Sequence, residues 1–468
     1  MKYVGVKTTG ELRLHEVKEP QTDEIYMAVE DDKLGAVPIR PYEFVKWDGK
    51  QWVKVPDVQL VTTLDISAGT SQDNPLMNAA STERMINAMK PINANTLRFE
   101  FSKKDYDPVA AGVGSAGTWT KLGSPTLNIW DWTNTNTDWH KSFEGAFPDE
   151  DNKVSVISAG DTSSVTVFEK MFAGIYNGAP ESGSSYSLVT RNNIVECVGF
   201  NISNATDVRY MFIGSALKHG NFDLSHAEIV TAFYADTYIE KIGDIDCSSA
   251  EYIGMLFCRC SKLLDVGSIK VSSACQKAPG VFAYCSLLEH FVGLIGDTSN
   301  IYIYQTVCQS CYNLKQVDIP FDFSSVTQAN CAGAFNGCRA LPKTAFINLT
   351  DKVTNLQAFL SANYVTSEIP IDEMDTSNVT SFSRSFENMR TIDKIPDLDV
   401  SKATNVERMF RYCYNVKYGI LEMYNKLLAR GASITNHANC FTDCGRDTPE
   451  GRAALAQIPA SWGGTAAG

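Results

Sequence analysis

The strongest constraint on the fold of this chain is a repeat of about 25 residues that recurs through most of its length. Each copy holds an apolar anchor, usually in a phrase such as MF, LF, VF or AF, and from Phe233 to Phe410 successive anchors are 24 to 27 residues apart. A unit this short cannot bury its own apolar face, so neighbouring units must stack. We therefore expect a solenoid of about 12 units. The anchors are Phe143, Phe172, Phe212, Phe233, Phe257, Phe282, Cys308, Phe335, Leu360, Phe386, Phe410 and Phe441.

Other positions recur in phase with the anchor. Apolar residues seven and four before it, and a residue three after it, describe one stripe of an α-helix. A serine nine before the anchor, such as Ser248, stands where it would cap that helix, and Ser248 to Glu251 resembles a capping box. Strand-like pieces such as IGDID precede the serine. Each unit is thus predicted to be strand, cap, short helix and turn, which gives an α/β solenoid with a parallel sheet along one side.

Cysteine occupies the position three after the anchor in many units. Cys308 and Cys311 have the spacing of a metal or redox pair, and Cys258 and Cys260 come close to it. Because the residues recur once per unit, we favour small apolar side chains stacked in the core, unbridged in a reducing compartment. The residues expected to form the structural core of the repeat are Phe212, Phe257, Phe282, Phe335, Phe386, Phe410, Cys260, Cys285, Cys311, Cys338 and Cys413.

Catalytic and metal-binding motifs are not evident in the sequence. The six histidines are scattered without metal-ligand spacing, and no nucleotide-binding or nucleophile motif is found. A carboxylate pair is conceivable at Asp244, Asp246, Asp397 and Asp399, but these residues belong to the repeat, which favours a structural role. The acidic loop at 148–152 could bind calcium, but we favour a solvated turn because no EF-hand spacing surrounds it. We expect no enzyme activity, no cofactor and no metal.

The parts outside the repeats differ in character. Strand-like stretches around turns occupy the N-terminus, a helix is predicted over Ser81 to Lys90 before Pro91, and TLRFEF reads as a strand. A longer helix is expected at ILEMYNKLLARG. The predicted organisation is a β-rich attachment module at 1–60, a linker and solenoid cap at 61–125, the solenoid at 126–445 and a capping tail at 446–468.

The units DTSNVTSFSRSFENMRTI and DVSKATNVERMFRYCYNV resemble the BspA-like leucine-rich-repeat family. The resemblance implies a leucine-rich-repeat-like solenoid that binds ligands at a cell surface. The closing segment RAALAQIPASWGG is similar to the ends of such repeats in proteins of gut (crAss-like) bacteriophages, which implies a virion fibre protein.

The net charge and the N-terminal sequence restrict the partners and the cellular location that we expect for this chain. The net charge of −13, without a stripe of Lys and Arg, argues against nucleic acid and anionic membranes as partners. The N-terminus lacks the features of a signal peptide. We expect a head or tail fibre, made in the host cytoplasm, that contacts other virion proteins through residues 1–60 and a host-surface protein or glycan through the solenoid. A homo-oligomer is left open. The alternatives are a bacterial surface adhesin and a phage spike depolymerase.

Overall fold

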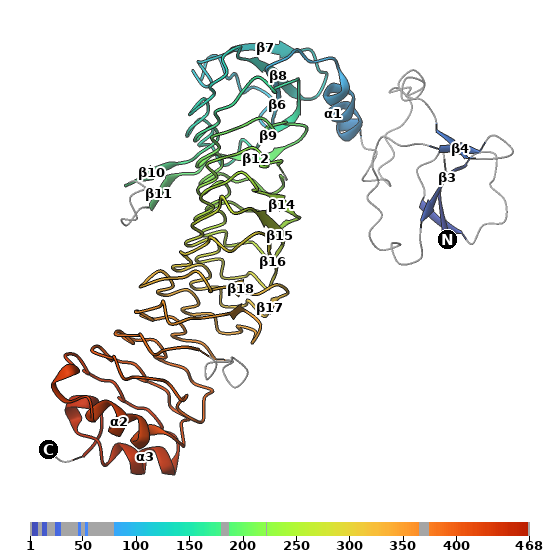
Figure 1. Cartoon of the computed structure of the whole chain (residues 1–468). Helices are drawn as coiled ribbons and strands as arrows, with labels where there is room; N and C mark the ends of the chain where they lie inside the picture. Colours follow the sequence, from blue (N-terminus) through green and yellow to red (C-terminus); the bar gives the residue numbers. More distant parts are fainter. Residues whose placement is uncertain are drawn as a thin grey trace. The chain divides into compact units, whose positions relative to one another are not determined.

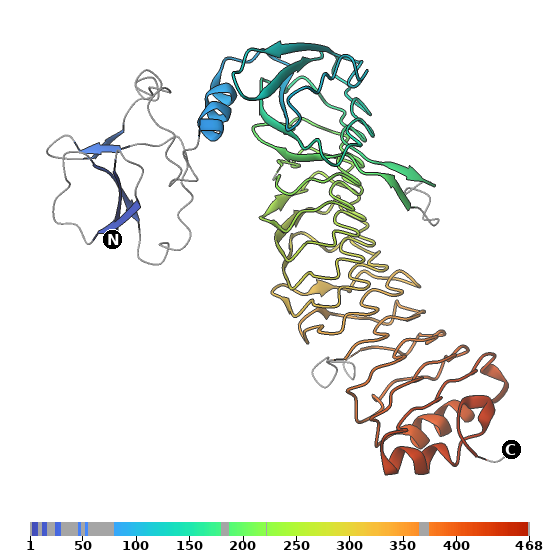
Figure 2. The same ribbon diagram turned by 180° about the vertical axis from the view of Figure 1, so that it is seen from behind.

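A computed structural model describes short strands within the first 60 residues and then residues 79–178, 187–220, 222–364 and 374–466. Figure 1 and Figure 2 show the chain from two sides. The chain divides into two compact units: Met1–Lys90 with Ser124–Leu127, and Pro91–Gly123 with Asn128–Gly468. The boundaries of the four domains expected from the sequence remain predictions.

The first unit contains two small antiparallel sheets and a helix. Strand β1 lies between β2 and β3, and β4 pairs with β5. Helix α1 agrees with the helix predicted at 81–90. The carboxylate of Glu83 in α1 accepts the N–H groups of Thr126 and Leu127 at 3.1 and 3.3 Å, which attaches that short segment to the helix. The bounds are β1 Lys2–Lys7, β2 Leu12–His15, β3 Glu24–Val29, β4 Val45–Trp47, β5 Trp52–Lys54 and α1 Ala79–Met89.

The second unit begins with a five-stranded sheet in the order β12-β9-β6-β8-β7. Strand β6, predicted from TLRFEF, is central and antiparallel to both neighbours, whereas β9 and β12 are parallel. The sheet therefore changes from antiparallel to parallel pairing where the solenoid starts. Its aromatic side chains cover the first anchor, since Trp132 lies 4.7 Å and Phe99 5.1 Å from Phe143 between ring centroids. The strands are β6 Thr96–Phe101, β7 Thr118–Leu122, β8 Asn128–Thr133, β9 Val154–Ala159 and β12 Ile194–Cys197.

Stacked coils form the rest of the second unit, and the predicted solenoid is confirmed. Parallel pairing joins β13, β14, β15, β16 and β17, and β18 with β19 further on. Figure 1 labels β14 to β18 along this part of the column. A row of single parallel bridges at the residue five before most anchors links the coils, as at Tyr252, Lys277 and Ile303. The bounds are β13 Lys241–Ile242, β14 Ile245–Asp246, β15 Asp265–Val271, β16 His290–Gly296, β17 Gln316–Val317, β18 Phe321–Asp322 and β19 Phe346–Ile347.

The short helix predicted in each unit is wrong: the described anchor segments are turns whose backbone bonds reach the next coil. N–H groups four before, two before, at and two after the anchor donate to the following coil, not to a residue four earlier in their own. In one coil the donors Ile253, Met255, Phe257 and Arg259 reach the carbonyls of Lys277, Pro279, Val281 and Ala283 at 2.8–3.1 Å. In most coils two residues, here Met255 and Arg259, are left-handed with φ of 58° and 64°. An α-helix cannot contain such residues, so the fold is a parallel β-solenoid with few helices.

The serine nine before the anchor does not cap a helix either. The carboxylate of Asp246 accepts the N–H of Ser248 at 2.9 Å, and Asp399 accepts the N–H of Ser401 at 2.8 Å. This is an Asx turn, in which the aspartate side chain accepts the backbone N–H of the residue two positions later in the chain. The recurring D-x-S phrase therefore makes the corner between the strand side and the anchor segment.

Anchor rings form a nearly parallel stack inside the column, and this stack corrects the register of one unit. Tyr234 lies parallel to Phe212 (12°) and to Phe257 (5°), whereas Phe233 is perpendicular to Phe212 (85°). The anchor of this unit is Tyr234. The corrected register also places Ser225 nine before the anchor, as in the other units.

An insertion and a closing segment interrupt the coils. The insertion between the Phe172 and Phe212 units begins and ends as a two-stranded ribbon, β10 Ile175–Asn177 with β11 Ser187–Thr190, which projects from the column in both views (Figures 1 and 2). At the other end α2 confirms the helix predicted from ILEMYNKLLARG. The N–H of Phe441 donates to the carbonyl of Trp462 at 2.9 Å, so the tail closes the last coil. These elements are α2 Ile420–Leu428, η5 Gly431–Ser433, α3 Pro449–Leu455 and η6 Ala460–Trp462.

Candidate functional site

One regular polar feature of the described solenoid is a row of alternating tyrosine and arginine side chains, which we name the Tyr–Arg ladder. It begins four residues after the anchor of the Cys308 unit and takes one residue from each following unit. Five members directly follow the residue three after the anchor, and the last comes one residue later. The members are Tyr312, Arg339, Tyr364, Arg390, Tyr414 and Arg446.

Each neighbouring pair in the ladder is within cation–π range. The guanidinium carbon of Arg339 lies 4.7 Å from the ring centre of Tyr312 and 5.4 Å from that of Tyr364. Arg390 lies 5.5 Å from Tyr364 and 5.3 Å from Tyr414. Arg446 completes the row, 4.0 Å from Tyr414. Every tyrosine after the first is therefore contacted by guanidinium groups on both sides.

The charges along the ladder are not balanced evenly. Arg446 pairs with Asp447 at 3.3 Å and with Asp443 at 3.5 Å, and these carboxylates hold its pKa above the ordinary value. Arg390 donates to the amide oxygen of Asn388 at 2.9 Å. Neither Arg390 nor Arg339 has a carboxylate partner among the described residues, and both are exposed. Two positive charges thus face solvent on an acidic protein.

A second polar feature lies on the strand side, around His290 at the start of β16. Its Nδ1 contacts Asp265 of β15 at 2.8 Å, and its Nε2 contacts Asp318 beyond β17 at 3.0 Å. Partial burial lowers the pKa of His290, but the two carboxylates outweigh this effect and hold the pKa above its ordinary value. The histidine bridges three coils, and both ring nitrogens already have protein partners.

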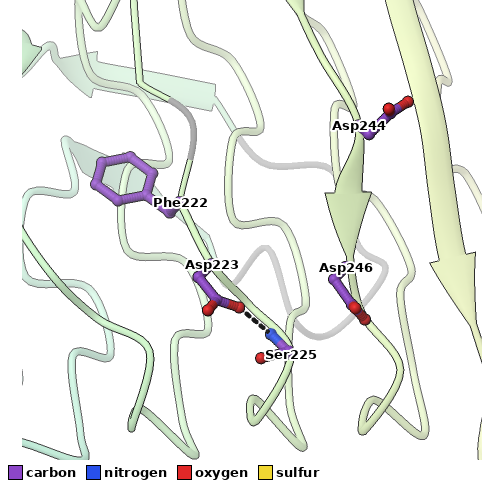
Figure 3. A pocket seen from close by; sticks show the side chains of 5 residues that line it. All are labelled: Phe222, Asp223, Ser225, Asp244 and Asp246. Carbon is purple, nitrogen blue, oxygen red and sulfur yellow. Dashed lines mark hydrogen bonds between the residues drawn. The ribbon is translucent and has the colours of Figure 1, made fainter. Parts of the chain in front are cut away.

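A shallow hollow of about 390 Å³ is lined by Phe222, Asp223, Ser225, Asp244 and Asp246 (Figure 3). Figure 3 shows Asp223 directed at the backbone of Ser225, while Asp244 points toward the next strand. Asp244 accepts the N–H and the hydroxyl of Ser268 at 2.7 and 2.8 Å, and these bonds lower its pKa.

Asp246 in the same hollow is also occupied. Partial burial raises its pKa, but hydrogen bonds from Lys270 and Ser248 outweigh this and lower the pKa overall. A general acid of a glycosidase needs a raised pKa. The described environment instead stabilises both Asp244 and Asp246 as carboxylates, which suits the structural role expected for the repeat.

The other acidic candidates also have protein partners. Asp397 pairs with Lys426 at 2.7 Å, and Asp399 forms the turn with Ser401 described above. In the acidic loop at 148–152, Asp149 pairs with Lys103 and accepts the N–H of Asp151 at 3.0 Å. These contacts favour the solvated turn over a calcium loop.

Five of the six cysteines three after the anchor donate to a defined partner inside the column. The thiol of Cys285 donates to the carbonyl of Phe257 at 2.9 Å, and that of Cys311 donates to Phe282 at 3.0 Å. The same contact to the anchor carbonyl of the preceding coil is made by Cys260, Cys338 and Cys413 at 2.9–3.1 Å. A cysteine therefore fills a small apolar space and also satisfies a buried acceptor.

All thirteen cysteines are free and buried. Burial raises the pKa of Cys413 to about 12 and that of Cys275 to about 11. Cys258 lies in a separate outer apolar cluster, away from the core that holds Cys260, so these two do not act as a pair. Among the residues that the structure describes, no three His, Cys, Asp or Glu side chains are grouped to hold a metal ion.

The predicted repeat-core residues all lie in the main apolar core with no exposed surface: Phe212, Phe257, Phe282, Phe335, Phe386, Phe410, Cys260, Cys285, Cys311, Cys338 and Cys413. The Tyr–Arg ladder was not predicted from the sequence. The sequence does contain a pattern that could have indicated it, because Tyr and Arg alternate at nearly the same position of six successive units. These residues become neighbours only when the units stack in phase.

Comparison with models of protein families gives a match. The family model described as "Mycoplasma protein of unknown function, DUF285" matches residues 121–238 and 329–442. Both segments fall largely on the coils. Among curated proteins and among solved structures, nothing matches the chain at a significant level. In the described part of the chain, no helix combines the length and apolarity needed to cross a membrane.

Proposed function

We propose that this chain is a non-enzymatic recognition protein of a bacteriophage virion, a head or tail fibre. Residues 1–60 would dock on other virion proteins, and the solenoid would present its surface to a host-surface protein or glycan. The observation that carries the recognition function is the Tyr–Arg ladder. Six side chains from six coils form one row, in which Tyr364 and Tyr414 are half-buried and the other four are exposed, and such a row suits binding of an extended ligand.

The finer family assignment is part of this proposal. The D-x-S phrases and the cysteine three after the anchor support kinship with BspA-like leucine-rich repeats, and the matched segments at 121–238 and 329–442 agree with a repeat family. The coils differ from the helical units we expected, so the proposed kinship concerns the repeat sequence and its stacking. The segment RAALAQIPASWGG supports the gut-bacteriophage form of the repeat.

A virion role is supported by the presence of two compact units, which allows attachment and recognition to be carried by different parts of the chain. One unit can fit a fixed site on a particle while the other carries the variable recognition surface. The two alternatives are a bacterial surface adhesin and a spike depolymerase. The depolymerase is disfavoured by Asp244 and Asp246, whose environments hold both groups ionised.

Electron microscopy with a gold-labelled antibody against the chain tests the virion role. Label on intact phage particles is expected, and label on the bacterial surface without label on particles would favour the adhesin. A companion chain that begins at Pro91 should fold but no longer incorporate into particles. This start keeps β6, the central strand of the capping sheet, which a start at Thr126 would delete.

A further inference from the structure

The chemistry of the Tyr–Arg ladder restricts the ligand it can bind. The tyrosine faces are contacted by guanidinium groups, so a ligand meets the outer edge of the row. The polar groups that these side chains can offer a ligand along the row are guanidinium N–H donors alternating with phenol hydroxyls. A ligand that fits it must offer negative groups and hydroxyls in alternation.

Two members carry a positive charge without a carboxylate partner among the described residues. Arg339 lies between Tyr312 and Tyr364, and Arg390 lies between Tyr364 and Tyr414. Packing between two rings fixes the planar guanidinium group before any ligand arrives, so little conformational entropy is lost on binding. A carboxylate is the natural partner, because it accepts two parallel N–H bonds from one guanidinium.

The spacing of the two charges selects among anionic ligands. Arg339 and Arg390 belong to coils two apart, which corresponds to roughly 10 Å at the usual separation of parallel strands. This is close to the length of two linked hexose rings in an extended polysaccharide. Single-stranded nucleic acid, the other ligand for rows of aromatic and basic side chains, is disfavoured by the net charge of −13.

We propose that the Tyr–Arg ladder binds an extended polysaccharide that carries one carboxylate per disaccharide, an alternating uronic acid polymer. Arg339 and Arg390 each pair with one carboxylate, and the tyrosine hydroxyls bond to the sugar hydroxyls between them. The polymer runs along the column, across the coils. This inference rests on the proposed recognition function and names its ligand class.

The test is isothermal titration calorimetry of the full chain with three probes: hyaluronan, which has one carboxylate per disaccharide, the same polymer with its carboxylates reduced to alcohols, and poly(dT). Binding to hyaluronan, with at least about 10-fold weaker binding to the reduced polymer, is expected because charge-assisted bonds are the strong ones. The double variant Arg339→Gln with Arg390→Gln should weaken hyaluronan binding by at least about 10-fold. The conservative Arg339→Lys keeps the charge without the planar fork, so an intermediate loss is expected.

A matched control removes two positive charges elsewhere. Lys352 and Lys402 are exposed, stand eight before their anchors and also belong to coils two apart. The double variant Lys352→Gln with Lys402→Gln should bind hyaluronan within about 2-fold of the unmodified chain, since exposed charges contribute little at a distance. Equal melting temperatures of all variants exclude misfolding as the cause.

Three results would overturn the inference: no binding to hyaluronan, equal loss in both double variants, or tighter binding of poly(dT) through Arg339 and Arg390. None of them bears on whether antibody labels phage particles. The failure of the ligand class is thus distinguishable from the failure of the virion role.

Discussion

Replacement of Phe257 by Ala tests the architecture most directly. The ring has no exposed surface and lies parallel to Tyr234 at 5.3 Å and to Phe282 at 5.6 Å between centroids. Burial and cavity terms for Phe→Ala amount to about 3–5 kcal/mol, and loss of two ring partners places this site near the upper end. Because each coil contacts only its neighbours, the cost should be concentrated around this coil.

Hydrogen exchange followed by mass spectrometry measures this local loss. The N–H groups of Ile253, Met255, Phe257 and Arg259 pair with the next coil, so their exchange reports the opening of this coil. A loss of about 4 kcal/mol predicts roughly 1,000-fold faster exchange there, with little change around Phe410. The control Tyr284→Ala removes a ring that is 46% exposed, and should change the rate by less than about 5-fold. A change below about 10-fold in Phe257→Ala would refute the stacked-anchor register.

Three further predictions concern other layers of the structure. The buried thiols should resist iodoacetamide in the folded chain because the reagent cannot reach them, and all thirteen should react after denaturation without reductant; disulfide-linked peptides would contradict this. Ala358 is left-handed with φ of 53°, so Ala358→Gly should raise the free energy of unfolding by about 0.5–1 kcal/mol in urea titrations, while Ala332→Gly, outside that region, should lower it by a similar amount. The raised pKa of His290 means that its charged form stabilises the fold below the unfolded pKa, and that this contribution is lost as pH rises through the folded pKa. The melting temperature should therefore fall more in His290→Gln at about pH 5.5 than at about pH 8.5, and an equal fall at both would count against the bridge.

Several elements could be predicted because local sequence decides them. Pro91 ends the helix before it, and an alternating apolar pattern makes Thr96–Phe101 a strand. The period of the repeat identified the buried positions, since any solenoid places the same phase inside, whatever the backbone does between.

The error about helices has a physical origin. Apolar residues at −7, −4, 0 and +3 are typical of a helix, but a turn-rich coil that faces its core every three to four residues gives the same pattern. A helix and such a coil differ in the acceptors of their backbone N–H groups. Because Met255 and Arg259 are left-handed, the backbone N–H groups of this segment donate to carbonyls of the next coil. Non-glycine residues rarely adopt that conformation alone, and hydrogen bonds from both neighbouring coils stabilise it here.

The sequence by itself determined that the chain must stack, which residues form the core and which cysteines stay in register, because burial of apolar side chains follows from the repeat. Only the tertiary structure decided the register of Tyr234 against Phe233, which depends on which ring is parallel to its neighbours. The Tyr–Arg ladder also depends on the tertiary structure. Arg339 and Arg390 are about fifty residues apart in sequence, and they share one exposed edge because each intervening coil repeats in phase.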